Sequence, residues 1–154
     1  MTKQLSFRPA KKEDLPAIVE MLADDFLGRQ RENLQNFLLY EKAFEEIEAD
    51  LNNELIIVEI SDEIVGTMQL TFIPSISFQG GKRAQIESVR VDAKHRGQGI
   101  GRKMFEWAIE RARQENCFLV QLSTNKDRID AQRFYENLGF KASHVGMKLY
   151  LKEN

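Results

Sequence analysis

The sequence predicts a single mixed α/β domain that covers residues 1–154. Amphipathic helical patterns alternate with short runs rich in β-branched residues, in the order β-α-α-β-β-β-α-β-α-β-β. No repeat, linker or low-complexity segment interrupts this order. A length of 154 residues, with 42% hydrophobic and 30% charged residues, is that of one globular domain able to bury a core. We therefore expect an α/β fold with about seven strands and about four helices.

The first elements are a strand followed by helical segments. An alternating run around Leu5 and Phe7 ends at Pro9, which predicts a strand. The stretch 14–26 carries its apolar residues on one face of a helix. From 29 to 50 apolar residues again recur at helical spacing, which predicts one helix or two.

Strands dominate the middle of the chain. Two β-branched runs, 54–60 and 64–73, are joined by three residues and predict a hairpin. A further strand is predicted at 82–91, but its apolar residues change parity partway along. Because successive side chains of a strand point to opposite faces, we expect a β-bulge near Ser88.

The last third predicts two helices and three short strands. A helix at about 99–114 follows a glycine-rich turn, and a short apolar strand is expected at 118–122. A second helix at 130–138 is ended by Gly139. The remaining residues to Leu151 are expected to supply two short strands.

The amino-acid composition argues against some classes of binding partner for this chain. A formal net charge of −2 argues against nucleic acid, since nucleic-acid-binding domains usually carry an excess of Lys and Arg. The one cysteine, Cys117, forms no internal disulfide, and no basic start is followed by a long apolar run. We therefore expect no membrane association and a cytoplasmic location.

Residues 89–102 place the end of a strand, a short loop and the first turn of a helix in direct succession. Backbone N–H groups at a helix N-terminus lack intrahelical partners and are reinforced by the helix dipole, so they make a site for a diphosphate. The segment 94–104 holds no acidic residue and four basic ones, Lys94, Arg96, Arg102 and Lys103. Neither the P-loop nor the Rossmann glycine pattern is present.

Two blocks of the chain resemble the GNAT N-acetyltransferases. Arg96, Gly99 and Gly101 meet motif A of that family, R/Q-x-x-G-x-G/A, and residues 131–140 match its A-x-x-F/L-Y-x-x-L-G-F helix. The order of predicted elements follows the family over essentially the whole chain. The resemblance implies a mixed, mostly antiparallel sheet, with the bulged strand directly before the turn that holds a pyrophosphate.

The resemblance also implies acetyl-CoA as cosubstrate and no metal. Acetyl-CoA would lie in a V-shaped opening between the bulged strand and 118–122, with backbone groups around Val89 and Val91 bonding the pantetheine. The residues expected to contact the cofactor are Val89, Val91, Arg96, Gly97, Gln98, Gly99, Ile100, Gly101, Arg102, Asn125, Arg128 and Tyr135.

One position departs from the family pattern. Many members carry Asn three residues before the alanine of the tyrosine-containing helix, where this chain has Arg128. Asn125 or Ser123 would then substitute as a cofactor contact, or Arg128 with Lys126 would reach toward the phosphates of the cofactor.

Two side chains are candidates for the catalytic chemistry. Attack of a neutral amine on a thioester needs a base for the ammonium proton and an acid for the departing thiolate. Tyr135 occupies the usual acid position of the family, although it could instead only pack against the pantetheine. Glu87, beside the expected bulge, is the candidate base, acting through water. Its alternative role is a structural ion pair, for example with Arg83.

The acceptor is indicated only by charge. The family usually bounds its acceptor site with the segment after the first helix, and residues 24–50 hold eight acidic residues against three basic ones. A cationic small-molecule amine or a peptide amine would suit such a segment, but the same charges could equally be a solvated helix face.

Two hypotheses for the function follow. The first is an acyltransferase that moves the acetyl group of acetyl-CoA directly to a primary amine of a small molecule or peptide. The second is a non-catalytic sensor or regulatory module that binds acyl-CoA on the same fold. Either would act as a monomer or a homodimer.

Overall fold

The computed structural model describes residues 4–153, which form two compact units. The first unit ends at Gln121 and the second begins at Leu122. A single domain over residues 1–154 stays a prediction.

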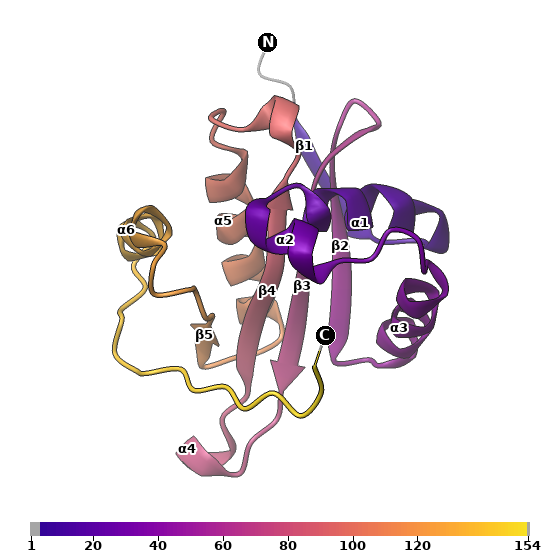
Figure 1. The fold of residues 1–154 in the computed structure, drawn as a ribbon. Coiled ribbons are helices and arrows are strands. Elements are labelled where there is room, and N and C mark those ends of the chain that lie inside the picture. The colour runs from indigo at the N-terminus through magenta and orange to yellow at the C-terminus, as the bar shows by residue number, and fades with distance from the viewer. Residues whose placement is uncertain (1–3, 154) are drawn as a thin grey trace. The chain divides into compact units, whose positions relative to one another are not determined.

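A five-stranded sheet forms the centre of the first unit (Figure 1). The strands lie in the spatial order β1-β2-β3-β4-β5, and the first four are antiparallel while β5 runs parallel to β4. Their bounds are β1 Leu5–Pro9, β2 Asn53–Ile60, β3 Glu63–Ile73, β4 Arg83–Val91 and β5 Leu119–Gln121. The α/β class and the mostly antiparallel sheet are therefore confirmed.

Local chemistry explains the predicted hairpin. Ser61 and Asp62 join β2 to β3 with φ of 50° and 66°. Two central residues with positive φ are those of a type I′ turn, whose twist matches that of the strands it joins.

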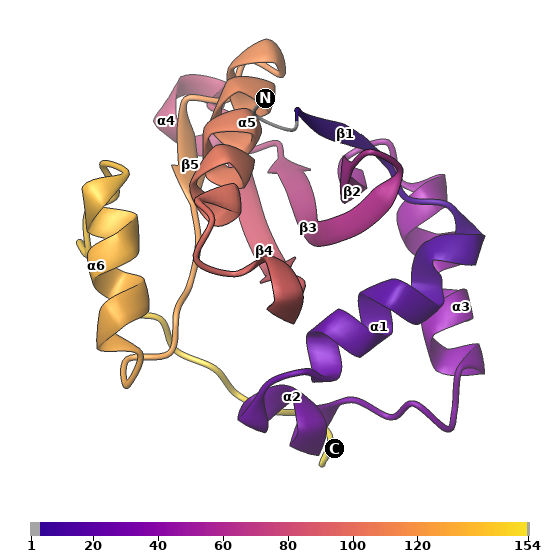
Figure 2. The same cartoon turned by 90° about the horizontal axis from the view of Figure 1, so that it is seen from above.

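Helices cover both faces of the sheet. Figure 2 shows α1 and α3 on one face and α5 on the other. The helices of this unit are α1 Leu15–Ala23, α2 Phe26–Arg31, α3 Leu38–Ala49, the short α4 Ser77–Gly80 and α5 Ile100–Gln114. Short 3-10 turns stand at Lys12–Asp14 and Ala93–His95. The region 29–50 therefore contains parts of two helices.

The break between α1 and α2 has a local cause. The Asp25 side chain caps α2 by accepting a hydrogen bond from the Gly28 N–H at 2.5 Å. A Cβ at Gly28 would lie 2.0 Å from the Leu22 carbonyl oxygen, so this close approach of α2 to the end of α1 requires glycine. The first helix consequently ends at Ala23, three residues before the predicted end at Phe26.

The core fills both sides of the sheet. Because helices cover both faces, β2 buries the consecutive apolar residues Ile56, Ile57 and Val58 instead of alternating ones. On one side Leu15, Ile18, Phe44 and Ile57 join α1, α3 and β2. On α5 the buried residues recur at helical spacing and are Ile100, Met104, Phe105, Ala108 and Ala112.

The predicted bulge lies at Ser88, whose φ is 53°. Thr67 pairs with Arg90 and Gln69 pairs with Glu87, so two residues of β4 oppose one residue of β3. The change of apolar parity in the sequence therefore predicted a real insertion in the ladder.

Residues 122–153 of the second unit contain one helix, α6 Ile129–Asn137. It ends as predicted at Gly139, whose φ is 99°. The Phe140 N–H bonds the Tyr135 carbonyl and the Gly139 N–H bonds the Glu136 carbonyl, which is the paired arrangement of a Schellman cap.

The two strands predicted before Leu151 were wrong. No strand is assigned to residues 141–153, so the described chain has five strands instead of about seven. A strand exists only where a neighbouring strand accepts and donates its backbone hydrogen bonds, and apolar alternation alone does not supply that neighbour.

A buried carboxylate predicts how stability depends on pH. Asp14 is 5% exposed and receives hydrogen bonds from the Arg8 guanidinium at 2.7 and 3.0 Å and from the Lys11 N–H at 2.7 Å. The bond from Arg8, above all, holds the pKa of Asp14 below its usual range. A depressed folded pKa gives stability above the unfolded pKa, and that stability is lost as pH falls through the folded value.

We therefore expect Asp14→Asn to lower the free energy of unfolding by roughly 2 kcal/mol at pH 7. The difference from the wild type should shrink as pH falls through the folded pKa of Asp14. Urea unfolding at several pH values measures it. Glu45→Gln, at an exposed carboxylate, is the control and should change little. A deficit in Asp14→Asn that stays constant down to pH 2 would contradict the ionic origin.

Candidate functional site

In the described chain, one edge of β4 has no neighbouring strand after Gln85. The parallel ladder joins only Arg83–Gln85 of β4 to Leu119–Gln121 of β5. Within the described chain no strand pairs with this edge of β4 from Ile86 to Val91. The strand therefore presents backbone groups at the bulge and just after it, where Val89 and Val91 are predicted to bond an extended ligand.

Two arginine side chains contact the carbonyl groups of these valines. Arg90 Nη1 donates to the Val89 carbonyl at 2.8 Å, and Arg96 Nε donates to the Val91 carbonyl at 3.2 Å. Each arginine also pairs with an aspartate from the junction of α1 and α2. Arg90 lies 3.4 Å from Asp25, and Arg96 lies 3.0 Å from Asp24.

The turn after β4 presents backbone donors. Gly97 and Gly99 both have φ of 76°, and a Cβ at either would meet no atom within 4 Å. The first helical bond of α5 runs from the Lys103 N–H to the Gly99 carbonyl. In the described chain the N–H groups from Gly97 to Arg102 therefore have no acceptor, and they stand at the positive end of a fifteen-residue helix.

The structure brings the predicted turn residues together. Ile100 is buried and anchors the helix start, so only its backbone is available to a ligand. Arg102 pairs with Glu106 at 3.0 Å, and the Gln98 side chain donates to the Lys94 carbonyl at 3.4 Å. Both contacts are exposed, so the unpaired backbone N–H groups of the turn are the feature that suits an anion.

The Asp92 side chain stabilises the loop between β4 and the turn through hydrogen bonds. Its carboxylate accepts the Lys94 N–H at 3.1 Å and lies 3.1 Å from His95 Nδ1. Partial burial opposes its ionisation, but the hydrogen bonds from His95 and Lys94 outweigh burial and hold the pKa of Asp92 below its usual range. Sequence reasoning did not single out this residue, although an acidic residue directly before a basic turn is a usable signal.

Glu87 lies next to the bulge with an exposed side chain. The ion pair with Arg83 that was considered from the sequence is not formed, and no side-chain partner of Glu87 is found among residues 4–153. A carboxylate that is neither paired nor buried is available to solvent and to a ligand.

The remaining predicted residues belong to the second unit. Tyr135 lies on α6, where its ring makes edge contacts with Phe134 at 5.5 Å and Phe140 at 6.2 Å between centroids. The Asn125 side chain accepts the Asp127 N–H, and the Asn125 backbone carbonyl accepts the Arg128 N–H at 2.9 Å. Asn125 and Arg128 thus shape the turn that leads into α6.

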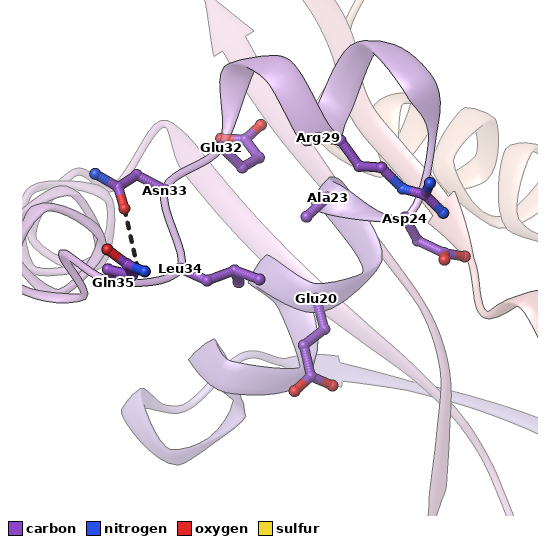
Figure 3. A pocket seen from close by; sticks show the side chains of 8 residues that line it. All are labelled: Glu20, Ala23, Asp24, Arg29, Glu32, Asn33, Leu34 and Gln35. Carbon is purple, nitrogen blue, oxygen red and sulfur yellow. Dashed lines mark hydrogen bonds between the residues drawn. The ribbon is translucent and has the colours of Figure 1, made fainter.

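A cavity of about 470 Å³ lies in the first unit at the α1–α2 junction (Figure 3). Its lining includes three carboxylates and one guanidinium: the lining residues are Glu20, Ala23, Asp24, Arg29, Glu32, Asn33, Leu34 and Gln35. Asp24 belongs both to this wall and to the ion pair with Arg96, so the cavity adjoins the turn.

Three further features concern the reactivity of Cys117, metal binding and membrane spanning. Burial raises the pKa of the Cys117 thiol, which disfavours the nucleophilic thiolate. In residues 4–153 no three His, Cys, Asp or Glu side chains gather in a way that could hold a metal ion. No helix in that part of the chain is long and apolar enough to cross a bilayer.

Comparison with known proteins identifies a family and several relatives. The profile of the acetyltransferase (GNAT) family matches residues 15–140. An aminoalkylphosphonate N-acetyltransferase of Salmonella typhimurium is 47% identical over 60 residues, 39% of each chain. A glucosamine 6-phosphate N-acetyltransferase of Trypanosoma brucei brucei is 34% identical over 88 residues, 57% of this chain and 58% of that one. The match thus spans about two fifths to three fifths of these curated relatives.

One solved structure is similar over nearly its whole length. The crystal structure of a transcriptional regulator from Bacillus halodurans C-125 superimposes with a TM-score of 0.91 and 51% identity. The similarity covers 96% of this chain and all of that one.

Proposed function

The chain belongs to the acetyltransferase (GNAT) family, and from that premise we propose that it transfers the acetyl group of acetyl-CoA directly to a primary amine. The observation that carries the proposal is the row of unpaired N–H groups from Gly97 to Arg102 at the start of α5. Such a row, with Arg96 and Arg102 beside it, suits the pyrophosphate of coenzyme A. No metal is needed for this transfer.

We propose that the pantetheine arm binds along the unpaired edge of β4. Backbone groups at Val89 and Val91 would hydrogen-bond its amides, as a neighbouring strand would do. Asn125 and Arg128 are proposed as further cofactor contacts from the turn before α6.

The proposed chemistry uses one base and one acid. The amine nitrogen attacks the thioester carbon while Glu87, through water, accepts the proton that the nitrogen loses. The carbon–sulfur bond then breaks, and the Tyr135 phenol donates a proton to the departing thiolate. The free, exposed carboxylate of Glu87 supports its part in this scheme.

A small amine is the proposed acceptor. A cavity of about 470 Å³ is of the size that holds small ligands. Of its three carboxylates, Asp24 pairs with Arg96 and Glu32 pairs with Arg31, which leaves Glu20 to attract a cationic amine. Two of the curated relatives are named for small amines that carry a phosphonate or phosphate group, which supports a small-molecule acceptor. The single unpaired cysteine agrees with a reducing compartment, and we place the protein in the cytoplasm.

A regulatory role is the second candidate, because the similar protein of Bacillus halodurans, at 51% identity, is named a transcriptional regulator. In that case the chain would bind acyl-CoA without turnover. The two candidates share the turn and differ in the need for Tyr135 and Glu87.

Thermal unfolding with and without acetyl-CoA, followed by thiol release with a panel of amines, tests the proposal. A ligand that binds only the folded state raises Tm. Raised Tm with turnover of at least one amine supports the enzyme, and raised Tm with no turnover of any amine favours the regulatory module. An unchanged Tm at saturating acetyl-CoA refutes both.

Glu87→Gln should lower kcat/KM roughly 10- to 100-fold, because the water that accepts the amine proton loses its base. The Tm shift caused by acetyl-CoA should persist. Asp62→Asn, which removes a carboxylate at the β2–β3 turn, is the matched control. An unchanged kcat/KM in Glu87→Gln would exclude Glu87 as the base.

A further inference from the structure

Arg96, the arginine of the turn after β4, forms an ion pair with a carboxylate of the protein itself. Arg96 Nη2 lies 3.0 Å from Asp24 Oδ2, and Arg96 Nε bonds the Val91 carbonyl at 3.2 Å. The ion pair brings together residues that are 72 positions apart in the sequence. Asp24 therefore contacts the Arg96 guanidinium, which is the group that we propose binds the pyrophosphate.

Asp24 has no other side-chain partner in the described chain. Its neighbour Asp25 differs, because the Asp25 carboxylate caps α2 through the Gly28 N–H and also pairs with Arg90. Asp24 stands one residue past the end of α1, on the wall of the cavity in Figure 3. Removing its charge thus leaves the helix cap intact.

The ion pair is weak enough to exchange. The Arg96 side chain is 51% exposed and that of Asp24 is 41% exposed. Exposed pairs of this kind contribute little net stability and are screened by salt. A diphosphate carries more charge than a carboxylate and is also bound by the N–H groups of the turn, so it would displace Asp24 from Arg96.

We infer that Asp24 is an internal competitor of the coenzyme A pyrophosphate for Arg96, and that it thereby sets the affinity for the donor. The inference rests on the proposed function, since it needs the donor at this turn. When the donor binds, Arg96 exchanges the carboxylate for the phosphates. Arg96 therefore links Asp24, on the wall of the cavity, to the turn that binds the donor in this proposal.

The test is a double-mutant cycle with Kd values for coenzyme A, measured by calorimetry at low ionic strength. The proteins are the wild type, Asp24→Asn, Arg96→Ala and the double variant. Asp24→Asn should bind coenzyme A roughly two- to fivefold more tightly than the wild type. In the Arg96→Ala background the same change should leave Kd unchanged within about 1.5-fold, because Asp24 acts through Arg96.

Two comparisons distinguish competition from a general charge effect. Glu110→Gln removes a carboxylate that pairs with Arg113 on the last turns of α5, and it should leave Kd unchanged. Raising the salt concentration should reduce the difference between the wild type and Asp24→Asn.

The outcomes separate this inference from the function on which it rests. A wild type that does not bind coenzyme A overturns both. A wild type that binds, with Asp24→Asn equal or weaker, overturns the competition alone. An equal gain from Asp24→Asn with and without Arg96 also overturns it, since the effect would then be long-range charge.

Discussion

Gly99→Asp is expected to weaken coenzyme A binding by about a thousandfold, whereas Gly99→Asn is expected to weaken it less than about tenfold. A Cβ at Gly99 meets no atom within 4 Å, so either side chain fits the free protein. The backbone there has φ of 76°, a conformation that Asn and Asp tolerate better than other residues. A carboxylate at this point faces the proposed diphosphate, and each pair of unit charges at about 4 Å costs about 4 kcal/mol near a protein surface.

The aspartate variant should fold at least as well as the asparagine variant. A negative charge at a helix N-terminus stabilises the helix by about 0.3–1 kcal/mol. Loss of coenzyme A binding with an unchanged or raised Tm therefore separates repulsion at the site from misfolding.

Calorimetric titration of both variants with coenzyme A measures the effect, and Gly99→Asn controls for size and backbone strain. Pantetheine, which has no phosphates, should bind the two variants equally. If Gly99→Asp binds coenzyme A as well as Gly99→Asn does, the pyrophosphate does not lie at this turn.

Tyr135→Phe is expected to lower kcat roughly 100-fold while KM for acetyl-CoA changes little. The substitution removes only the hydroxyl group, so the edge contacts of the ring with Phe134 and Phe140 are kept. A proton donor acts on the departing thiolate and contributes to the chemical step without contributing to ground-state binding.

Steady-state thiol release by Tyr135→Phe measures this loss, with Tyr150→Phe as the control at an exposed tyrosine of the same unit. An acetyl thioester of a more acidic thiol needs less protonation on departure, so the loss should be smaller with that donor. Equal kcat for the wild type and Tyr135→Phe would mean that the tyrosine only packs against its neighbours.

Features that depend on a few adjacent residues were predictable. The change of parity in β4 placed the bulge at Ser88, and the glycines after it placed the turn before α5. Gly139 placed the end of α6. In each case the conformation is decided by which residue types tolerate a given φ or alternate between faces, and this information is local.

Features that need a partner from elsewhere in the chain were not predictable to the same degree. Residues 141–151 were expected to supply two strands, yet no neighbouring strand pairs with them in the described chain. The first helix was expected to reach Phe26 but ends at Ala23, where the tight approach of Gly28 to the Leu22 carbonyl begins a new helix.

By itself the sequence determined the α/β class, the bulged strand and the glycine turn with its basic residues, because each follows from local periodicity and backbone preference. Only the tertiary structure decided which charges meet. Asp24 was one of eight acidic residues in an apparently uniform segment until the fold placed it 3.0 Å from Arg96. Glu87 was a possible partner of Arg83 until the fold left it unpaired. Ion pairs depend on distances of a few ångströms between side chains far apart in the chain, and packing alone sets those distances.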